Sequence, residues 1–194
     1  MIAVIDYGAA NLRSVTNALD RLKAHYVVCS DWATISGADR VILPGVGEAS
    51  YAMRRLRELE LADLLPTLTQ PFLGVCLGMQ LLCRWSAEGD VRCLDIIPSD
   101  VVRMEGDADN KVPHIGWNEI EELRSGLFEG IESGAFVYYV HSYCAPISEY
   151  TICSSDHSCP FSGAIASKNF YGCQFHPEKS GDVGERILKN FLTL

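Results

Sequence analysis

Short apolar runs alternate with helix-like periodicities along the first half of the chain. Residues 2–5 form an unbroken apolar run typical of a buried strand, whereas residues 11–23 repeat their apolar side chains at helical intervals. The same alternation predicts further strands at residues 26–29, 40–43 and 72–75 and further helices at residues 50–65 and 77–85. Strands and helices in alternation are joined by right-handed crossovers, so we expect a parallel sheet covered by helices on both faces.

The second half of the chain has a different pattern, in which strand-like runs follow one another with short turns between them. These runs occupy residues 101–104, 117–121, 136–140, 151–153, 163–167 and 170–174. Residues 105–110 are expected to form a flexible loop, and residues 183–192 a closing helix. The whole pattern predicts an α/β fold in one domain spanning residues 1–194: a mostly parallel twisted sheet flanked by helices and extended by antiparallel strands.

Charge and hydropathy narrow the possible function classes. The 194 residues include 16 Lys+Arg and 25 Asp+Glu, which gives a formal charge of −9. An acidic chain repels phosphate backbones and anionic lipids, so we expect neither nucleic acid nor a membrane as a partner. No apolar run approaches the ~20 residues that a membrane helix needs. The first five residues lead straight into Asp6 without a basic segment, which predicts no signal peptide and a cytoplasmic protein.

The eight cysteines do not follow a metal-binding or redox spacing. None belongs to a Cys-x-x-Cys pair, which argues against zinc ribbons and thioredoxin-like sites. In a reducing cytosol most of these thiols are expected to be small buried hydrophobes rather than disulfides. Asp156, His157 and Cys159 offer ligand atoms in one loop, but no other side chains are spaced to join them, so a solvated turn is the favoured interpretation.

The strongest local signal for chemistry is Gly74-Val75-Cys76-Leu77-Gly78, at the junction of a predicted strand and a predicted helix. This is the nucleophile-elbow pattern with cysteine as the nucleophile. Such a residue occupies a sharp, strained turn, and glycine two positions away on either side removes a clash. The helix N-terminus favours a thiolate, and the N–H of Leu77 is placed to stabilise an oxyanion. The alternative is a buried cysteine in a glycine-rich turn.

A base for this cysteine is available in the segment His176-Pro177-Glu178. In an extended segment, residues two apart face the same side, so His176 and Glu178 can lie together. We expect His176 to take the thiol proton and return it to a leaving nitrogen, while Glu178 orients the imidazole and stabilises its charged form. The alternative is a surface histidine before a turn.

The cysteine elbow with Met79 and Gln80 after it, combined with the His-Pro-Glu segment, resembles the class I (triad) glutamine amidotransferases. Other segments are similar to one subfamily, the glutaminase subunits of imidazole glycerol phosphate synthase. These segments are Asp6-Tyr7-Gly8, Asn11-Leu12-Arg13-Ser14, Pro44-Gly45-Val46-Gly47, Lys111-Val112-Pro113-His114-Ile115-Gly116-Trp117-Asn118 and Tyr139-Val140-His141-Ser142-Tyr143. The resemblance spans essentially the whole chain.

The resemblance implies roles for further residues. Gln80 should hold the substrate glutamine. The segment from Val140 to Tyr143, which contains His141 and Ser142, should help to bind its α-amino and carboxylate groups. The turn containing Val46 and Gly47 should offer the second oxyanion donor, expected at the N–H of Val46. His141 could instead be a packed strand-end residue, and His114 and Asn118 are interpreted as supporting or interface residues. The resemblance calls for no metal and no cofactor.

The function implied is hydrolysis of L-glutamine to glutamate and ammonia by a Cys-His-Glu triad. The ammonia would pass, within a heterodimer, to a cyclase subunit that makes imidazole glycerol phosphate and aminoimidazole carboxamide ribotide in histidine biosynthesis. Three alternatives remain at this stage: an ammonia supplier for another synthase, a γ-glutamyl hydrolase or peptidase with the same triad, and a binding subunit without activity. The intact triad argues against the last, and Gln80 together with the interface-like segment from Lys111 to Asn118 argues against the second.

Overall fold

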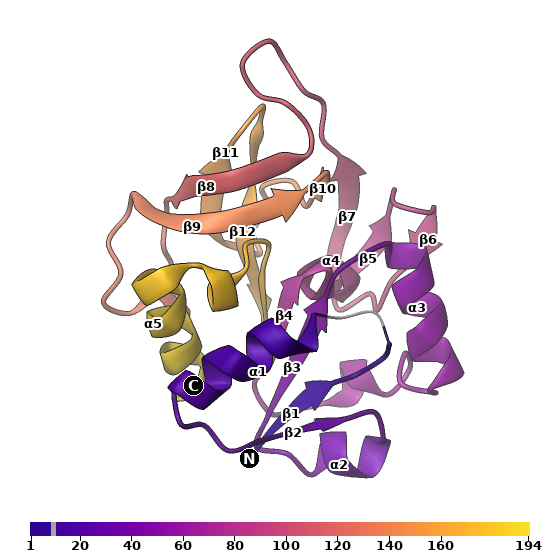
Figure 1. Cartoon of the computed structure of the whole chain (residues 1–194). Helices are drawn as coiled ribbons and strands as arrows, with labels where there is room; N and C mark the ends of the chain where they lie inside the picture. Colours follow the sequence, from indigo (N-terminus) through magenta and orange to yellow (C-terminus); the bar gives the residue numbers. More distant parts are fainter. Residues whose placement is uncertain (9–10) are drawn as a thin grey trace.

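The computed structural model describes residues 1–8 and 11–194 and contains one large sheet of seven strands (Figure 1). The strand order is β11-β12-β13-β4-β3-β1-β2. Five neighbouring strands run parallel, namely β13 (Phe170–Cys173), β4 (Phe72–Cys76), β3 (Arg40–Gly45), β1 (Ile2–Ile5) and β2 (Tyr26–Cys29). Antiparallel strands β12 (Pro160–Ser167) and β11 (Thr151–Asp156) extend this sheet, which confirms the predicted fold class.

Two smaller sheets lie beyond the large one. The first has the order β10-β7-β5-β6 and the second is the hairpin-like pair β8-β9. Their strands are β10 (Tyr143–Cys144), β7 (Ile97–Arg103), β5 (Cys83–Ser86), β6 (Val91–Arg92), β8 (His114–Ile120) and β9 (Ala135–His141). Residues 105–110 lie in the loop between β7 and β8, where the sequence placed one.

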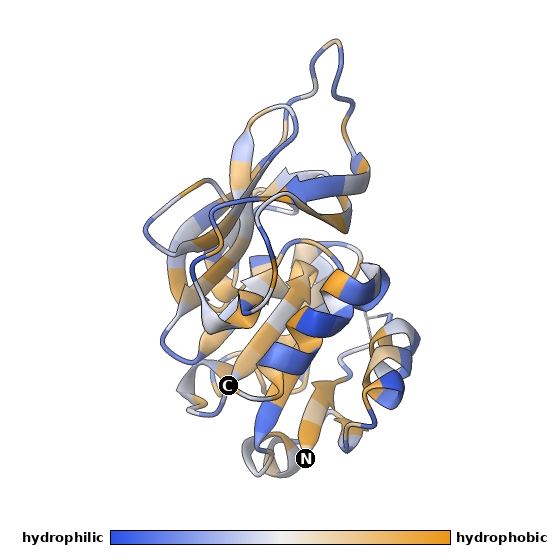
Figure 2. Cartoon of the chain, turned by 90° about the vertical axis from the view of Figure 1, so that its left-hand side faces the viewer, coloured by the Kyte–Doolittle hydropathy of each residue, from blue (hydrophilic) through white to orange (hydrophobic). Residues whose placement is uncertain are grey.

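Helices cover both faces of the large sheet because alternate residues of its central strands point in opposite directions. Ala3 and Ile5 belong to a buried cluster with residues of α2, α3 and α4, whereas Ile2 and Val4 pack with residues of α1 and α5. Hydrophilic residues lie on the outward sides of the helices (Figure 2). The helices are α1 (Leu12–Arg21), α2 (Trp32–Ser36), α3 (Ala49–Glu58), α4 (Leu77–Leu82) and α5 (Gly181–Phe191), with 3-10 turns η1 (Leu65–Thr67), η2 (Gly126–Phe128) and η3 (Pro177–Lys179).

Two predicted helices are shorter than expected. The helix predicted at residues 50–65 ends at Glu58, where Glu60 takes a positive φ of 58° that a helix cannot continue through. The helix predicted at residues 77–85 ends at Leu82, and the next four residues form β5. Strand β5 pairs with β6 and β7, and this pairing outweighs the local helical spacing.

Most of the cysteines are buried, as the sequence predicted. All eight cysteines are free thiols, and only Cys29 and Cys159 are not buried. No helix in the described ranges combines the length and the apolar character needed to cross a membrane.

The parallel strands end where the elbow begins. In the register of β3 and β4, Gly45 pairs with Cys76. The glycine turn that follows β3 and the cysteine at the end of β4 are therefore neighbours at the carboxyl edge of the sheet, which is where parallel α/β sheets carry their ligand sites.

Candidate active site

Cys76 sits at the junction of β4 and α4 in a strained backbone conformation. Its φ is 54° and its ψ is −109°, values that few residues with a side chain adopt. The flanking glycines make this turn possible. A Cβ at Gly74 would lie 2.5 Å from the carbonyl oxygen of Gly78, and a Cβ at Gly78 would lie 1.9 Å from that of Leu43. The sharp turn can therefore form only with glycine at both positions.

His176 and Glu178 form a buried pair beside the elbow. The Nδ1 atom of His176 lies 2.8 Å from Oε1 of Glu178, and their side chains are 2% and 3% exposed. The sequence predicted this pairing from an extended segment in which residues two apart face the same side, and that explanation was wrong. Only His176 is extended, and Glu178 lies in the 3-10 turn η3, which folds its carboxylate back toward the imidazole. Pro177 begins that turn, and the hydroxyl of Ser180 donates to the carbonyl of His176 at 2.7 Å.

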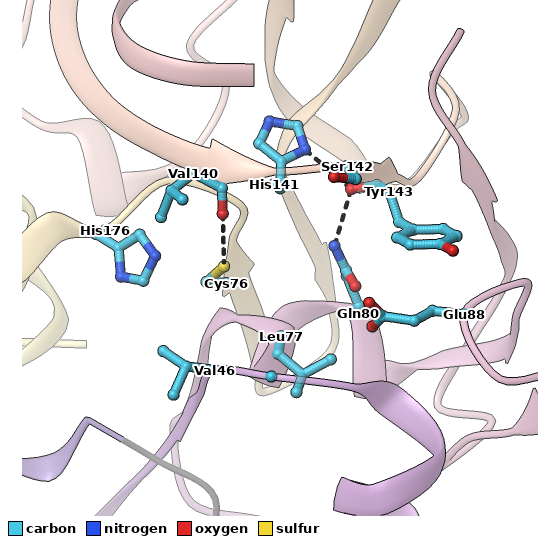
Figure 3. Close-up of a pocket in the computed structure, with 11 residues that line it drawn as sticks. Val46, Cys76, Leu77, Gln80, Glu88, Val140, His141, Ser142, Tyr143 and His176 are labelled. Carbon is cyan, nitrogen blue, oxygen red and sulfur yellow. Dashed lines mark hydrogen bonds between the residues drawn. The ribbon is translucent and has the colours of Figure 1, made fainter. Parts of the chain in front are cut away.

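The electrostatics of the pair favour a protonated imidazole. Burial alone lowers the pKa of His176, but its interactions with Cys76 and Glu178 raise it to about 10. Within the described residues, the Nε2 atom of His176 has no hydrogen-bond partner, so it is available for proton exchange. Figure 3 shows His176 and Cys76 side by side at the pocket. The arrangement can accept the thiol proton and hold it next to a developing negative charge.

The pocket above Cys76 gathers the residues singled out in the sequence. Its lining consists of Val46, Gly47, Cys76, Leu77, Gln80, Glu88, Val140, His141, Ser142, Tyr143 and His176. Glu178 lies behind His176 and does not line the pocket. The oxyanion and substrate-binding roles of the lining residues remain predictions.

Glu88 is the lining residue that sequence reasoning missed. It follows β5, and its Oε2 accepts the N–H of Ala49 at the start of α3 at 3.0 Å. Burial is the main cause that raises its pKa, and Glu48 adds to it. A lone glutamate just beyond the helix predicted at residues 77–85 carries no motif, so only the three-dimensional structure reveals it.

Gln80 presents an acceptor to the pocket. Its Nε2 donates to the carbonyl of Tyr143 at 2.9 Å and to Oε1 of Gln174 at 2.9 Å. Both N–H groups are therefore used inside the protein, and Oε1 is the atom left for a ligand. Gln80 and the carboxylate of Glu88 lie on the side of the pocket away from His176 (Figure 3), where they can receive an ammonium group.

His141, which lines the pocket, is supported by a hydrogen bond with His114. Nδ1 of His141 lies 2.9 Å from the carbonyl of Tyr143, so it must donate. Its Nε2 then accepts from Nδ1 of His114 at 3.0 Å, and Asn118 lies 3.4 Å from the remaining nitrogen of His114. The nearby His157 stacks on His114 at 4.0 Å and donates to the carbonyl of Lys111. These contacts fit the supporting role expected for His114 and Asn118.

Acid should destabilise the folded chain through this support. Burial is the largest cause that lowers the pKa of His114 to about 3 and of His141 to about 4, against an ordinary value of 6.5. Between pH 6.5 and about 4 the unfolded chain therefore binds more protons than the folded chain. For each extra proton bound, the free energy of unfolding falls by about 1.4 kcal/mol when the pH is lowered by one unit.

This pH dependence can be measured by urea unfolding of wild type and His114→Phe at several values between about pH 7 and 5. The phenylalanine keeps the stacking on Tyr139 and His157 but cannot bind a proton. We expect the loss of stability with acid to be shallower in the variant by roughly one proton. Equal slopes in the two proteins would show that His114 does not contribute.

The described part of the chain holds no group of three His, Cys, Asp or Glu side chains close enough together to ligate a metal ion. The loop that carries Asp156, His157 and Cys159 instead packs through its histidine, while Cys159 is exposed.

Comparison with known proteins shows the family to which the chain is related. The model of the glutamine amidotransferase class-I family matches residues 3–194. A Bacteroides fragilis protein named imidazole glycerol phosphate synthase subunit HisH is 53% identical over 100% of this chain and 99% of its own length. A Bacteroides thetaiotaomicron protein of the same name is 49% identical over 100% of this chain and 99% of its own length. A Legionella pneumophila protein named imidazole glycerol phosphate synthase subunit HisH 2 is 46% identical over 100% of this chain and 98% of its own length.

Solved structures share the fold at much lower identity. A crystal structure of a glutamine amidotransferase superposes with a TM-score of 0.75 at 17% identity, covering 100% of this chain and 98% of the other. The PurLQS structure from Thermotoga maritima contains a chain that matches with a TM-score of 0.70 at 16% identity, covering 99% and 97%.

Proposed function

Because the chain belongs to the class I glutamine amidotransferase family, we propose that Cys76, His176 and Glu178 carry out its glutamine hydrolysis. The chain is the glutaminase subunit of an imidazole glycerol phosphate synthase. Relatives that are about 50% identical to it over their full length carry the name of that subunit. The observation that carries the assignment of residues is the buried His176–Glu178 pair beside a strained cysteine elbow.

The geometry supports a two-step hydrolysis. The sulfur of Cys76 attacks the side-chain amide carbon of glutamine while His176 takes the thiol proton. The oxyanion of the tetrahedral intermediate is stabilised by the N–H of Leu77, the first residue of α4, and by a second donor proposed at Val46. His176 returns its proton to the nitrogen, the C–N bond breaks, and ammonia leaves. Water activated by His176 then hydrolyses the thioester to glutamate and restores the thiol.

The pocket also supports a free amino acid as the substrate. The free amino acid carries an ammonium group, and Glu88 with Oε1 of Gln80 provides a carboxylate and a carbonyl oxygen to receive it. The residues His141, Ser142 and Tyr143 line the same pocket and are proposed to bind the other end of the amino-acid group. Binding of both ends fixes the amide carbon relative to Cys76, which is the positioning that a covalent mechanism needs.

The subunit names of the relatives imply that the chain works with a partner synthase subunit, and we propose a heterodimer with the cyclase. The outer face of the β8-β9 pair carries Ile115, Trp117 and Phe136, which are 59%, 55% and 50% exposed. Large apolar side chains clustered on one exposed face mark interaction surfaces. Strand β9 also supplies Val140 and His141 to the pocket, so a partner bound to this face adjoins the site of ammonia release.

The partner proposal is tested with Trp117→Ala and with Val28→Ala as a matched control. Val28 is 40% exposed on the edge strand β2, at the opposite end of the molecule (Figure 1). Loss of a central aromatic should weaken binding of the cyclase by roughly 2 kcal/mol, or about thirtyfold, whereas the control should bind like wild type. Titration calorimetry measures both affinities.

The same complex tests the function itself. Glutamate formation should rise when the cyclase and its nucleotide substrate are added, because an ammonia supplier gains from acting only when an acceptor is present. Full glutaminase activity without the partner, or no binding to the cyclase, would redirect the assignment to an ammonia supplier for another synthase.

A further inference from the structure

One buried glutamine in the site has no role in the mechanism described so far. Gln174 lies between β13 and His176, and its side chain is fully buried. Its Nε2 lies 3.7 Å from the sulfur of Cys76, within hydrogen-bond range for sulfur, and its Oε1 accepts from Gln80 at 2.9 Å. It therefore joins the nucleophile to a residue of the substrate pocket.

One backbone group fixes the direction of each hydrogen bond in the series that links Tyr143, Gln80, Gln174 and Cys76. The carbonyl of Tyr143 can only accept, so the atom of Gln80 that faces it must be Nε2. The second N–H of that nitrogen points at Gln174, which must therefore present its oxygen. The amide nitrogen of Gln174 is then the atom that faces the sulfur. Tyr143 thus determines, through two amides, that Cys76 faces a donor.

A donor beside the sulfur has a chemical consequence. A hydrogen bond donated to a group that ionises favours its charged form, since the anion is the stronger acceptor. The sulfur also lies 3.9 Å from the carbonyl of Val140, which can only accept. The amide of Gln174 therefore favours the thiolate and holds it in place, whereas Val140 interacts with the thiol.

Resting on the proposed function, we infer that Gln174 is a positioning residue that couples the substrate-binding amide of Gln80 to the nucleophilic sulfur of Cys76. Gln174 does not itself line the substrate pocket, but it contacts two residues that do, Cys76 and Gln80. A glutamine that occupies the pocket and bonds to Oε1 of Gln80 holds that amide in place, and with it the donor on the sulfur.

Other charged groups near the sulfur must be kept constant in a test. His176 and Glu178 face it from the segment after β13, Tyr7 interacts with it from the end of β1, and Glu88 lines the same pocket. The substitution Gln174→Glu changes none of these. It keeps an oxygen for Gln80, and in place of the N–H donor it puts a carboxylate oxygen beside the sulfur, whose negative charge repels a thiolate.

The test is the pH dependence of Cys76 alkylation by iodoacetamide, in which the thiolate displaces iodide, followed by peptide mass spectrometry. It needs neither glutamine nor the cyclase, so it is independent of the proposed function. For Gln174→Glu we expect the rate near neutral pH to fall at least tenfold and the midpoint of the profile to move up by about one pH unit or more. The matched control is Gln70→Glu, at the opposite end of β4, where Gln70 donates to Ile35; its profile should match wild type.

Two further variants keep the test decisive if a buried carboxylate prevents folding. Gln174→Leu removes the donor without adding charge and should move the midpoint in the same direction by a smaller amount. Gln80→Leu should also move it, although that side chain does not touch the sulfur, because the orientation of Gln174 is then no longer fixed. In the glutaminase assay, Gln174→Leu should lower kcat roughly tenfold to a hundredfold with little change in KM. A folded Gln174→Leu protein with the alkylation profile and kcat of wild type would overturn the inference.

Discussion

The Cys76→Ala protein should form no glutamate from glutamine, while its complex with the cyclase should still make product from added ammonium. The thioester cannot form without the sulfur, and removal of a covalent nucleophile costs about 10⁴–10⁶ in turnover. Alanine keeps the Cβ atom and therefore the backbone strain at a φ of 54° that the elbow already tolerates, so the fold should be unchanged. Glutamate and cyclase product are measured on the same sample.

Cys83 provides the matched control for this experiment. Unlike Cys76, which lines the pocket, Cys83 is fully buried at the start of the strand after α4. Burial raises the pKa of its thiol, so it is not expected to react. Cys83→Ala should retain glutaminase activity, and an electrophilic glutamine analogue should label Cys76 and leave Cys83 unmodified. Glutamate formation by Cys76→Ala at a rate above that in buffer without protein would contradict the mechanism.

The sequence predicts those parts of the fold that depend on the local pattern of residues. Residues 2–5, 41–43 and 72–75 are apolar at every position because both faces of the parallel sheet are covered, and the predicted strands that contain them are all found as central strands. The glycines of the elbow are predictable for a similar reason, since the clashes that exclude other residues arise within one β–α turn and its neighbouring strand.

The errors fall where distant segments decide the structure. Residues 83–86 follow a helix and continue its apolar spacing, but they pair with β6 and β7, which lie later in the chain. The carboxylate of Glu178 reaches His176 through a 3-10 turn rather than an extended segment. Glu88 is held by a contact with α3 and Gln174 by a contact with α4. Neither contact can be predicted from the spacing of residues along the sequence.

His176→Asn should lower glutaminase turnover by about 10³–10⁵, and Glu178→Gln by only about 10–10². His176 exchanges a proton in both steps, so its loss removes activation of the sulfur and protonation of the leaving nitrogen together. Glu178 transfers no proton; its carboxylate, 2.8 Å from Nδ1, orients the ring and stabilises its cation. Steady-state kinetics of the complex with saturating cyclase gives both values.

The pKa of His176 provides a second measurement that distinguishes orientation from a general loss of structure. The carboxylate of Glu178 is one of the groups that raise this pKa to about 10, so Glu178→Gln should lower it, as followed by NMR titration of the imidazole. Asp100→Asn is the control, because it removes the same charge from a carboxylate that pairs with Arg84 at the surface. That variant should keep both the turnover and the pKa of His176. If Glu178→Gln cost as much turnover as His176→Asn while the pKa of His176 stayed the same, the carboxylate would have to act on the reaction directly, and its assignment as the group that orients the base would be wrong.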